Sequence, residues 1–232
     1  MKSVAIVGAN GFVGQALCKA SKNYDVKVTK VTRKNYGYYK NFNYDILINT
    51  AMPSRRFWSS NNPTDDVMET ITKTANLFYE WQYKKFVQVS SISAENQLDI
   101  PYGAHKRAAE VIVSSDEDAL IVRLGALFGD GLSKSALFDL LSDNHMYVDI
   151  NSEYNYIDIS FVSNWIFKNI ERSGIINLGA KDTISLLEIS NFINAEPSYE
   201  GKLEKVNFKE INEIMPSSRE VLKYALTFKG MI

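Results

Sequence analysis

A glycine-rich turn near the N-terminus constrains the fold of this chain more than any other feature. The turn reads Gly8-Ala-Asn-Gly11-Phe-Val-Gly14; it directly follows an apolar run at Ser3–Val7 and leads into a helical pattern over Phe12–Ala20. Glycine allows a tight turn and a close approach to a phosphate, while a helix N-terminus offers N–H donors and a partial positive charge. The chain therefore predicts a buried strand, a phosphate-binding turn and a helix at its start.

The first two thirds of the chain alternate short apolar runs with helical patterns, and the pattern is looser after Gly129. Such alternation predicts an α/β fold, in which parallel strands are joined by crossover helices. We predict strands at Val26–Thr32, Asp45–Thr50, Phe86–Ser90, Ala119–Gly125 and Ile175–Leu178, and helices at Asn62–Tyr83, Tyr102–Val113, Ser185–Ile193 and Ser217–Leu226.

Composition excludes several classes of protein. The 232 residues suit one domain, or one domain with a small appendage. Cys18 is the only cysteine and cannot form an intrachain disulfide, and with only His105 and His145 beside it a Cys/His zinc site is not expected. The net charge of −1 argues against a nucleic-acid partner, and no run reaches the ~18 apolar residues of a membrane span. We expect a cytoplasmic protein with no metal, nucleic-acid or membrane partner.

Five further segments support the prediction of a dinucleotide-binding fold that begins with the glycine turn. They are Asn62–Leu77, Lys85–Ser91, Arg123–Gly129, Tyr156–Ser163 and Gly174–Gly179. With the GxxGxxG turn, they resemble the short-chain dehydrogenase/reductase superfamily, particularly its extended, NAD-dependent epimerase/dehydratase-like branch that acts on nucleotide sugars. The resemblance implies a Rossmann-like doubly wound parallel sheet with a small C-terminal substrate-binding region.

The same resemblance divides the chain. It implies a dinucleotide-binding Rossmann domain over residues 1–128, with its sheet completed by about 157–180, and a small substrate-binding region over 129–156 and 181–232. Family members often form homodimers through two helices that correspond to Asn62–Tyr83 and Tyr102–Val113, whose apolar residues suit such a homodimer and core packing equally well.

Tyr102-Gly-Ala-His-Lys106 matches the YxxxK motif of this family. The i, i+4 spacing puts both side chains on one helical face. A free tyrosine has a pKa near ~10, and a nearby ammonium lowers it toward the range useful for proton exchange. By resemblance, Tyr102 protonates a carbonyl oxygen, Lys106 also binds the nicotinamide ribose, and Ser91 hydrogen-bonds the reacting oxygen, with Ser90 and Ser93 as alternatives for that serine.

The end of the second predicted strand bears on the choice of cofactor. NAD enzymes usually carry an acidic residue there and NADP enzymes an arginine, whereas this chain has Thr32, Arg33 and Lys34. We expect NADP(H) to be preferred, with NAD(H) as the alternative. The predicted cofactor-binding residues are Gly8, Asn10, Gly11, Phe12, Val13, Gly14, Thr32, Arg33, Lys34, Thr50, Ala51 and Lys106.

The sequence lacks catalytic residues that some branches of the family need, which limits the reactions expected of it. Ile92 and Ser93 stand where dehydratases of the family carry an Asp-Glu pair, and the scarcity of Cys and His argues against epimerases that need extra bases. We expect an NADPH-dependent reductase of a nucleotide-linked 4-keto-6-deoxysugar. The alternatives are an NAD(P)-dependent nucleotide-sugar 4-epimerase, although Ala126 replaces an asparagine common in those enzymes, and a non-catalytic NADP-binding sensor or scaffold.

Substrate contacts are less constrained by the sequence. Arg55 and Arg56 follow the Asp45–Thr50 strand at the edge where ligands bind such sheets, and they suit either a diphosphate clamp or a solvated loop. Ser93 and Arg219 are the other candidates. His105 is interpreted as structural, because it points to a different helix face from Lys106. Compared with the family, the chain is shortened between Arg33 and Asp45 and between Ser91 and Tyr102.

Overall fold

Residues 1–205 and 215–230 are described by a computed structural model, and the chain divides into two compact units. The first unit comprises Met1–Leu124 with Ser163–Ile176, and the second comprises Gly125–Val162 with Asn177–Ile232.

The first unit is built on a six-stranded sheet with the strand order β2-β1-β3-β4-β5-β9. β1 runs parallel to β2 and β3, and β4 runs parallel to β3 and β5, so the predicted parallel sheet is confirmed. The strands are β1 (Lys2–Val7), β2 (Val26–Val31), β3 (Asn43–Asn49), β4 (Gln82–Ser91), β5 (Leu120–Leu124) and β9 (Gly174–Leu178).

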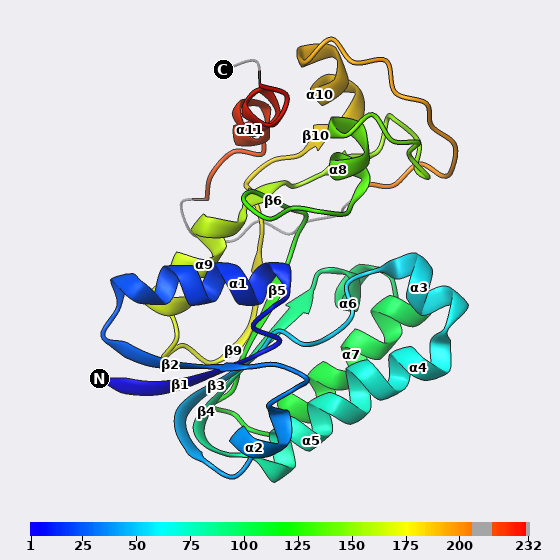
Figure 1. Ribbon diagram of the computed structural model, residues 1–232. Coiled ribbons are helices and arrows are strands. Elements are labelled where there is room, and N and C mark those ends of the chain that lie inside the picture. Colours follow the sequence, from blue (N-terminus) through cyan, green and yellow to red (C-terminus); the bar gives the residue numbers. More distant parts are fainter. Residues whose placement is uncertain (206–214, 231–232) are drawn as a thin grey trace. The chain divides into compact units, whose positions relative to one another are not determined.

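Helices cover both faces of this sheet (Figure 1). α1 and residues 163–168 of α9 lie on one face, while α4, α5 and α7 lie on the other, which is the doubly wound, Rossmann-like arrangement. The helices of this unit are α1 (Phe12–Ala20), η1 (Ser21–Asn23), α2 (Tyr36–Tyr39), α3 (Arg56–Asn61), α4 (Pro63–Val67), η2 (Met68–Thr72), α5 (Lys73–Glu80), α6 (Ser93–Asn96) and α7 (Pro101–Val113), together with residues 163–168 of α9 (Ile159–Lys168).

Burial explains why the apolar runs form the central strands. Strands covered by helices on both faces bury nearly every side chain, so they read as continuous apolar runs. On the α5/α7 face, Leu47 and Phe86 of the sheet are fully buried with Leu77 of α5 and Val113 of α7. On the α1 face, Leu17 of that helix is fully buried. The helices are thereby fixed to the strands that carry the loops at the carboxyl edge.

The prediction of one regular helix over Asn62–Tyr83 is wrong in two respects: the helix contains a π-helical turn, and it ends before Tyr83. α4 and α5 are separated by a π-helical turn, η2, and the helix ends at Glu80 because Trp81 is extended, with φ −94° and ψ 154°. Trp81 is buried, stacks on Tyr44 and donates a hydrogen bond to the hydroxyl of Tyr36. Burial of this aromatic ring against neighbouring elements outweighs the local helical pattern, so β4 starts at Gln82.

The shortened connection between β2 and β3 contains only the four-residue helix α2. Tyr36 and Tyr39 of this helix pack against the hydrophobic core of the unit, and Tyr36 lies edge-on to Trp81, with ring centroids 5.1 Å apart. The second short connection, between Ser91 and Tyr102, contains α6. Both connections therefore hold a single turn of helix where the sequence predicts none.

The second unit has its own core. Leu137 and Leu140 of α8, Ile189 of α10 and Val221 of α11 are fully buried together. Its elements are β6 (Leu127–Phe128), α8 (Ala136–Leu141), β7 (Glu153–Tyr154), β8 (Ile157–Asp158), β10 (Ile184–Ser185), α10 (Leu186–Phe192) and α11 (Glu220–Phe228). The two predicted C-terminal helices are thus present with slightly shifted ends. Residues 206–214 and 231–232 of the predicted substrate-binding region lie outside the described residues.

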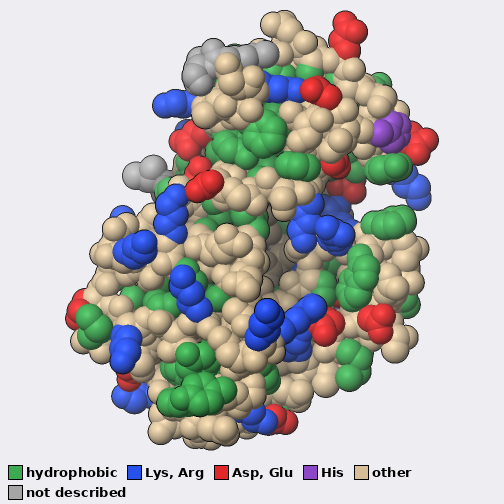
Figure 2. Space-filling model, viewed as in Figure 1, with side chains coloured by type: hydrophobic (Ala, Val, Ile, Leu, Met, Phe, Trp, Pro, Cys, Tyr) green, Lys and Arg blue, Asp and Glu red, His purple; other side chains and the backbone are tan. Residues whose placement is uncertain are grey.

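Acidic, basic and apolar side chains are interspersed on the face drawn in Figure 2, in keeping with the net charge of −1. Within residues 1–205 and 215–230, no helix combines the length and the apolar character needed to cross a membrane.

The packing of the sheet gives a direct test. Replacing the fully buried Phe86 by alanine leaves a cavity between β4 and the helices above it. We expect Phe86→Ala to lower the free energy of unfolding by about 3–5 kcal/mol, measured by urea denaturation. The matched control is Phe57→Ala, since Phe57 is 82% exposed and its loss should change stability by less than about 0.5 kcal/mol. Equal effects of the two variants would contradict the assigned core.

Candidate active site

The glycine turn joins β1 to α1 as the sequence predicts. α1 begins at Phe12, and no side chain caps its first turn. A Cβ atom at Gly14 would lie 2.2 Å from the carbonyl oxygen of Gly8, so only glycine lets the helix approach the turn this closely. Asn10 lies exposed on the turn, where its carbonyl oxygen accepts a hydrogen bond from Gln15. The first-turn N–H groups of Phe12 and Val13 are therefore available to an anion, as a dinucleotide phosphate requires.

The carboxyl end of β3 lies against this turn. The Thr50 hydroxyl donates a 2.8 Å hydrogen bond to the carbonyl oxygen of Val7, and the N–H of Ala51 donates to the side-chain oxygen of Asn49. Asn49 is fully buried and donates to Gln88 and Thr74. Sequence analysis identifies Thr50 and Ala51 but misses Asn49, because its partners come from β4 and α5.

The end of β2 presents two exposed cations. Arg33 and Lys34 are exposed, and a guanidinium nitrogen of Arg33 lies 3.7 Å from a carboxylate oxygen of Glu69. The N–H and hydroxyl of Thr32 both donate to the side-chain oxygen of Asn35, at 2.7 and 3.2 Å. Asn35 therefore fixes the loop that carries these cations, a role that sequence analysis misses.

The structure brings Ser91, Tyr102 and Lys106 together. Tyr102 and Lys106 lie one turn apart on α7, with the Lys106 ammonium nitrogen 4.8 Å from the centroid of the tyrosine ring. Ser91 ends β4, and its hydroxyl is hydrogen-bonded to that of Tyr102. The N–H of Ser93 donates to the Ser91 oxygen at 3.2 Å. Because that oxygen already accepts a hydrogen bond, its own proton can be donated to Tyr102 or to a reacting oxygen.

Burial dominates the electrostatics of this group. Desolvation raises the pKa of Tyr102 above its ordinary value, although the Ser91 hydrogen bond and the nearby Arg56 oppose that shift. Desolvation also lowers the pKa of Lys106 to about 7, against the opposing charges of Asp66 and Glu110. The direction for Tyr102 differs from the sequence expectation, in which the lysine lowers the tyrosine pKa, because both groups are withdrawn from water. Tyr102 therefore holds its proton at neutral pH.

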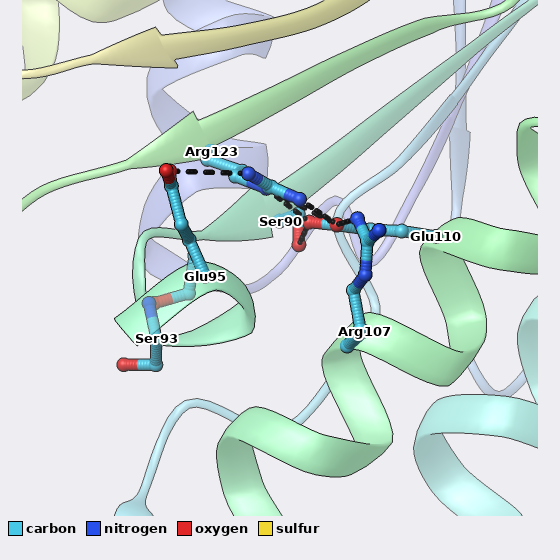
Figure 3. Close-up of polar contacts among 7 residues, drawn as sticks. Ser90, Ser93, Glu95, Arg107, Glu110 and Arg123 are labelled. Atoms are coloured by element: carbon cyan, nitrogen blue, oxygen red, sulfur yellow. Dashed lines mark hydrogen bonds and ion pairs between the residues drawn. The ribbon is translucent and has the colours of Figure 1, made fainter. Parts of the chain in front are cut away.

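A buried ion-pair network anchors α7 to the sheet (Figure 3). Glu110 of α7 is fully buried and accepts hydrogen bonds from Arg123 of β5, the shortest being 2.6 Å. The Ser90 hydroxyl also donates to Glu110 at 2.6 Å, and Arg123 reaches Glu95 of α6 at 3.2 Å. Ser90 is thus engaged in the network, whereas Ser91 faces Tyr102. Sequence analysis does not identify Glu110, because its buried partners Ser90 and Arg123 come from two strands of the sheet.

Close packing at the start of α7 sets the position of Tyr102. A Cβ atom at Gly103 would lie 1.9 Å from the carbonyl oxygen of Gln97 and 2.5 Å from that of Ser93. α6 therefore lies directly against the first turn of α7, and it occupies the short connection between Ser91 and Tyr102. Ser93 is buried at the start of α6, beside Ser91 in sequence.

The predicted substrate residues are in different surroundings. Arg55 is exposed just before α3, and Arg56 begins that helix, near enough to Tyr102 to lower its pKa. Arg219 belongs to the second unit, where its guanidinium lies 3.1 Å from Glu188 and 3.7 Å from Asp182. Arg56 thus belongs to the surroundings of Tyr102, while Arg219 takes part in ion pairs within its own unit. No cluster of three potential metal ligands of the His, Cys, Asp or Glu type occurs in the described part of the chain.

The ion pair between Glu110 and Arg123 predicts a large loss of stability when its charge is removed. Glu110→Gln leaves the buried Arg123 guanidinium with weakened compensation, so we expect the free energy of unfolding to fall by about 3–5 kcal/mol. Urea denaturation at neutral pH measures this loss. Glu117→Gln removes the same charge from an exposed position and should have an effect below about 0.5 kcal/mol. If Glu110→Gln left the free energy of unfolding unchanged, the ion-pair network would not be needed for stability.

Comparisons with known proteins show the family and the fold of this chain. The model of the NAD dependent epimerase/dehydratase family matches residues 4–145. No sequence match was found among curated proteins.

Three solved structures illustrate the similarity in fold. An NAD-dependent NDP-hexosamine 5,6-dehydratase, TunA, from tunicamycin biosynthesis has a TM-score of 0.81 at 15% identity, covering 100% of this chain and 99% of its own. A UDP-N-acetylglucosamine 4-epimerase from Methanobrevibacter ruminantium has a TM-score of 0.79 at 16% identity, covering 99% and 97%. A dTDP-4-dehydrorhamnose reductase from Clostridium acetobutylicum has a TM-score of 0.79 at 17% identity, covering 99% and 100%. These structures confirm the Rossmann-like fold.

Proposed function

Because this chain belongs to the NAD dependent epimerase/dehydratase family, we propose that it reduces a keto group on a nucleotide-linked sugar with NADPH. The family makes it an NAD(P)-dependent enzyme of the short-chain dehydrogenase/reductase type, and the proposal specifies its reaction and cofactor. The observation that carries the proposal is the trio of Ser91, Tyr102 and Lys106, in which a buried tyrosine keeps its proton next to a serine hydroxyl.

The first unit fits a dinucleotide. The uncapped first turn of α1 would bind the pyrophosphate, and the missing side chain of Gly14 lets that helix pack closely on the turn. The Lys106 ammonium donates a 2.8 Å hydrogen bond to the carbonyl oxygen of Pro53. An ammonium has three donors, so Lys106 retains two, and one can bind the nicotinamide ribose.

The residues of the trio have separate roles in the proposed reaction. A bound NADPH would supply the hydride for the keto carbon. Ser91 donates a hydrogen bond to the keto oxygen and stabilises the negative charge that develops there. Tyr102 then transfers its phenolic proton to that oxygen, giving the alcohol. The Lys106 ammonium stabilises the resulting phenolate until solvent restores the proton.

The protonated tyrosine favours reduction as the direction of the reaction. Reduction of a ketone to an alcohol needs a proton donor, and the raised pKa of Tyr102 keeps its hydroxyl protonated at neutral pH. Ile92 and Ser93 follow Ser91, and neither is the acid or base that a dehydration requires. Among the structures that share the fold are a nucleotide-sugar reductase, an epimerase and a dehydratase. These support a nucleotide sugar as the substrate class.

The second unit supplies substrate contacts in this proposal. Its small helical core is separate from the dinucleotide-binding sheet, which suits a region whose loops vary with the substrate. Arg55 and Arg56 are the proposed contacts of the first unit with the diphosphate, since an arginine fork matches phosphate oxygens. A homodimer stays a prediction.

Replacing Tyr102 tests the reaction. Tyr102→Phe removes the transferable proton and keeps the ring, so NADPH oxidation with nucleotide 4-keto sugars should fall by about 10²-fold or more, while NADPH binding is retained. Absorbance at the NADPH band follows turnover, and cofactor fluorescence follows binding. Tyr79→Phe is the matched control, because Tyr79 is 66% exposed.

Two results would count against the proposed reaction. Unchanged turnover in Tyr102→Phe would exclude the tyrosine as the acid. Conversion of a nucleotide sugar into its 4-epimer without net NADPH consumption would identify the enzyme as an epimerase.

The cofactor preference depends on the cations at the end of β2. We expect Arg33→Ala to raise the Kd for NADPH about tenfold or more, because a charge-assisted hydrogen bond to the 2′-phosphate is worth roughly 1.5–3 kcal/mol. The Kd for NADH should not change. Lys27→Ala, which removes an exposed cation from the same strand, controls for overall charge when all constants are measured at one ionic strength. Equal affinities of the unmodified protein for NADPH and NADH would exclude the preference.

A further inference from the structure

Two buried side-chain amides lie side by side in the sheet and have no part in the reaction as described. Asn49 ends β3, and Gln88 lies opposite it on β4. Both are fully buried, and Nδ2 of Asn49 donates a 3.0 Å hydrogen bond to Oε1 of Gln88 and a 3.2 Å hydrogen bond to the Thr74 hydroxyl. Burying an amide costs free energy that an apolar side chain of similar size would not cost. The pair therefore indicates a role other than filling the core.

The two amides hold the segment that follows β3, residues 50–53. The N–H of Ala51 donates a 3.0 Å hydrogen bond to Oδ1 of Asn49. Because a backbone N–H can only donate, it orients the Asn49 amide and directs Nδ2 of that residue toward Gln88. Gln88 then turns its oxygen toward Asn49, and its Nε2 donates a 3.2 Å hydrogen bond to the sulfur of Met52. Both amides therefore contact the segment in one defined orientation.

The same segment extends from the phosphate-binding turn to Lys106. A Cβ atom at Gly8 would lie 2.8 Å from the hydroxyl oxygen of Thr50 and 2.9 Å from Cα of Ala51, so the segment lies directly against the turn. At its other end, the carbonyl oxygen of Pro53 accepts the 2.8 Å hydrogen bond from the Lys106 ammonium. Four residues thus connect the turn that would bind the pyrophosphate with the ammonium that would bind the nicotinamide ribose.

We propose that Asn49 and Gln88 are positioning residues that orient the Lys106 ammonium through residues 50–53. The inference rests on the proposed function, because it concerns the contact of Lys106 with the cofactor. An ammonium that directs one N–H at Pro53 has its other two N–H groups fixed by tetrahedral geometry. A shift of the Pro53 carbonyl would therefore turn those two donors away from the ribose.

The start of the segment is held independently of the amides. The N–H and the hydroxyl of Thr50 both donate to the carbonyl oxygen of Val7, at 2.9 and 2.8 Å. Asn49 and Gln88 act beyond that point, on Ala51 and Met52, the two residues that precede Pro53. Loss of the amide contacts should consequently displace the Lys106 end of the segment and leave its phosphate end in place.

The affinities for the cofactor and for a fragment of it test this inference. Gln88→Met keeps the length of the side chain and removes its hydrogen bonds. We expect the Kd for NADPH to rise about three- to tenfold, as for the loss of roughly one hydrogen bond to the ribose. The Kd for adenosine 2′,5′-bisphosphate, which lacks the nicotinamide ribose, should stay within about twofold. Val87→Ala, at a fully buried position of the same strand, is the matched control and should change neither constant.

A double-mutant cycle separates positioning from a general loosening of the fold. Lys106→Met removes the ammonium, so in that background Gln88→Met should no longer change the Kd for NADPH. A merely structural defect would weaken binding by the same factor with or without Lys106. Equal factors in the two backgrounds, or equal weakening of NADPH and the fragment, would overturn the inference.

Met52→Leu tests the same path from the segment itself and guards against misfolding of Gln88→Met. Met52 is partly exposed, and leucine has a similar volume but no sulfur acceptor, so the fold should tolerate the change. We expect a weaker affinity for NADPH and an unchanged affinity for the fragment. If Met52→Leu bound NADPH as tightly as the unmodified protein, Gln88 would not act through this segment and the inference would fail.

The outcome is independent of the substrate. NADH and ADP replace NADPH and the bisphosphate if the protein binds NADH more tightly. If the cycle gives the expected result while no keto sugar is reduced, the role of Asn49 and Gln88 stands and the proposed reaction fails. If a keto sugar is reduced while Gln88→Met affects cofactor and fragment alike, the reaction stands and this inference fails.

Discussion

The buried ion pair between Glu110 and Arg123 is the interaction on which the arrangement of this site depends. It joins α7 to β5, and through Ser90 and Glu95 it also fixes the end of β4 and the helix α6. Tyr102 and Lys106 lie on α7, whereas Ser91 lies on β4. A shift of the helix relative to the strand would separate the tyrosine from the serine. The network therefore holds Tyr102 and Lys106 of α7 at a fixed distance from Ser91 of β4.

Burial in the same region determines which group holds a proton. The i, i+4 spacing of Tyr102 and Lys106 suggests that the ammonium lowers the tyrosine pKa, but desolvation is the larger effect and raises it. The lysine loses most of its preference for the charged form for the same reason, with the pKa at about 7. The site thus combines a tyrosine that keeps its proton with a lysine whose charge is weakened by burial. The proposed reduction uses the first of these properties.

Local patterns predict the parts of the fold that rest on local interactions. The glycine turn, α1 and the central strands follow from glycine spacing and from runs that are buried on both faces. The extended Trp81, the burial of Glu110 and the contact between Asp66 and His105 were not predicted. Each depends on a residue from another element: Tyr36 for Trp81, Arg123 for Glu110 and His105 for Asp66. Packing partners of this kind leave no periodic signal.

The proposed reaction transfers hydride from NADPH to a nucleotide-linked ketone. The most direct measurement uses NADPH carrying deuterium at the transferable position of the nicotinamide, with a nucleotide 4-keto sugar as the acceptor and mass spectrometry of the product. We expect one deuterium at the former keto carbon for each NADPH oxidised. A product that carries no deuterium, or a sugar that changes configuration while the labelled NADPH remains unconsumed, would contradict it.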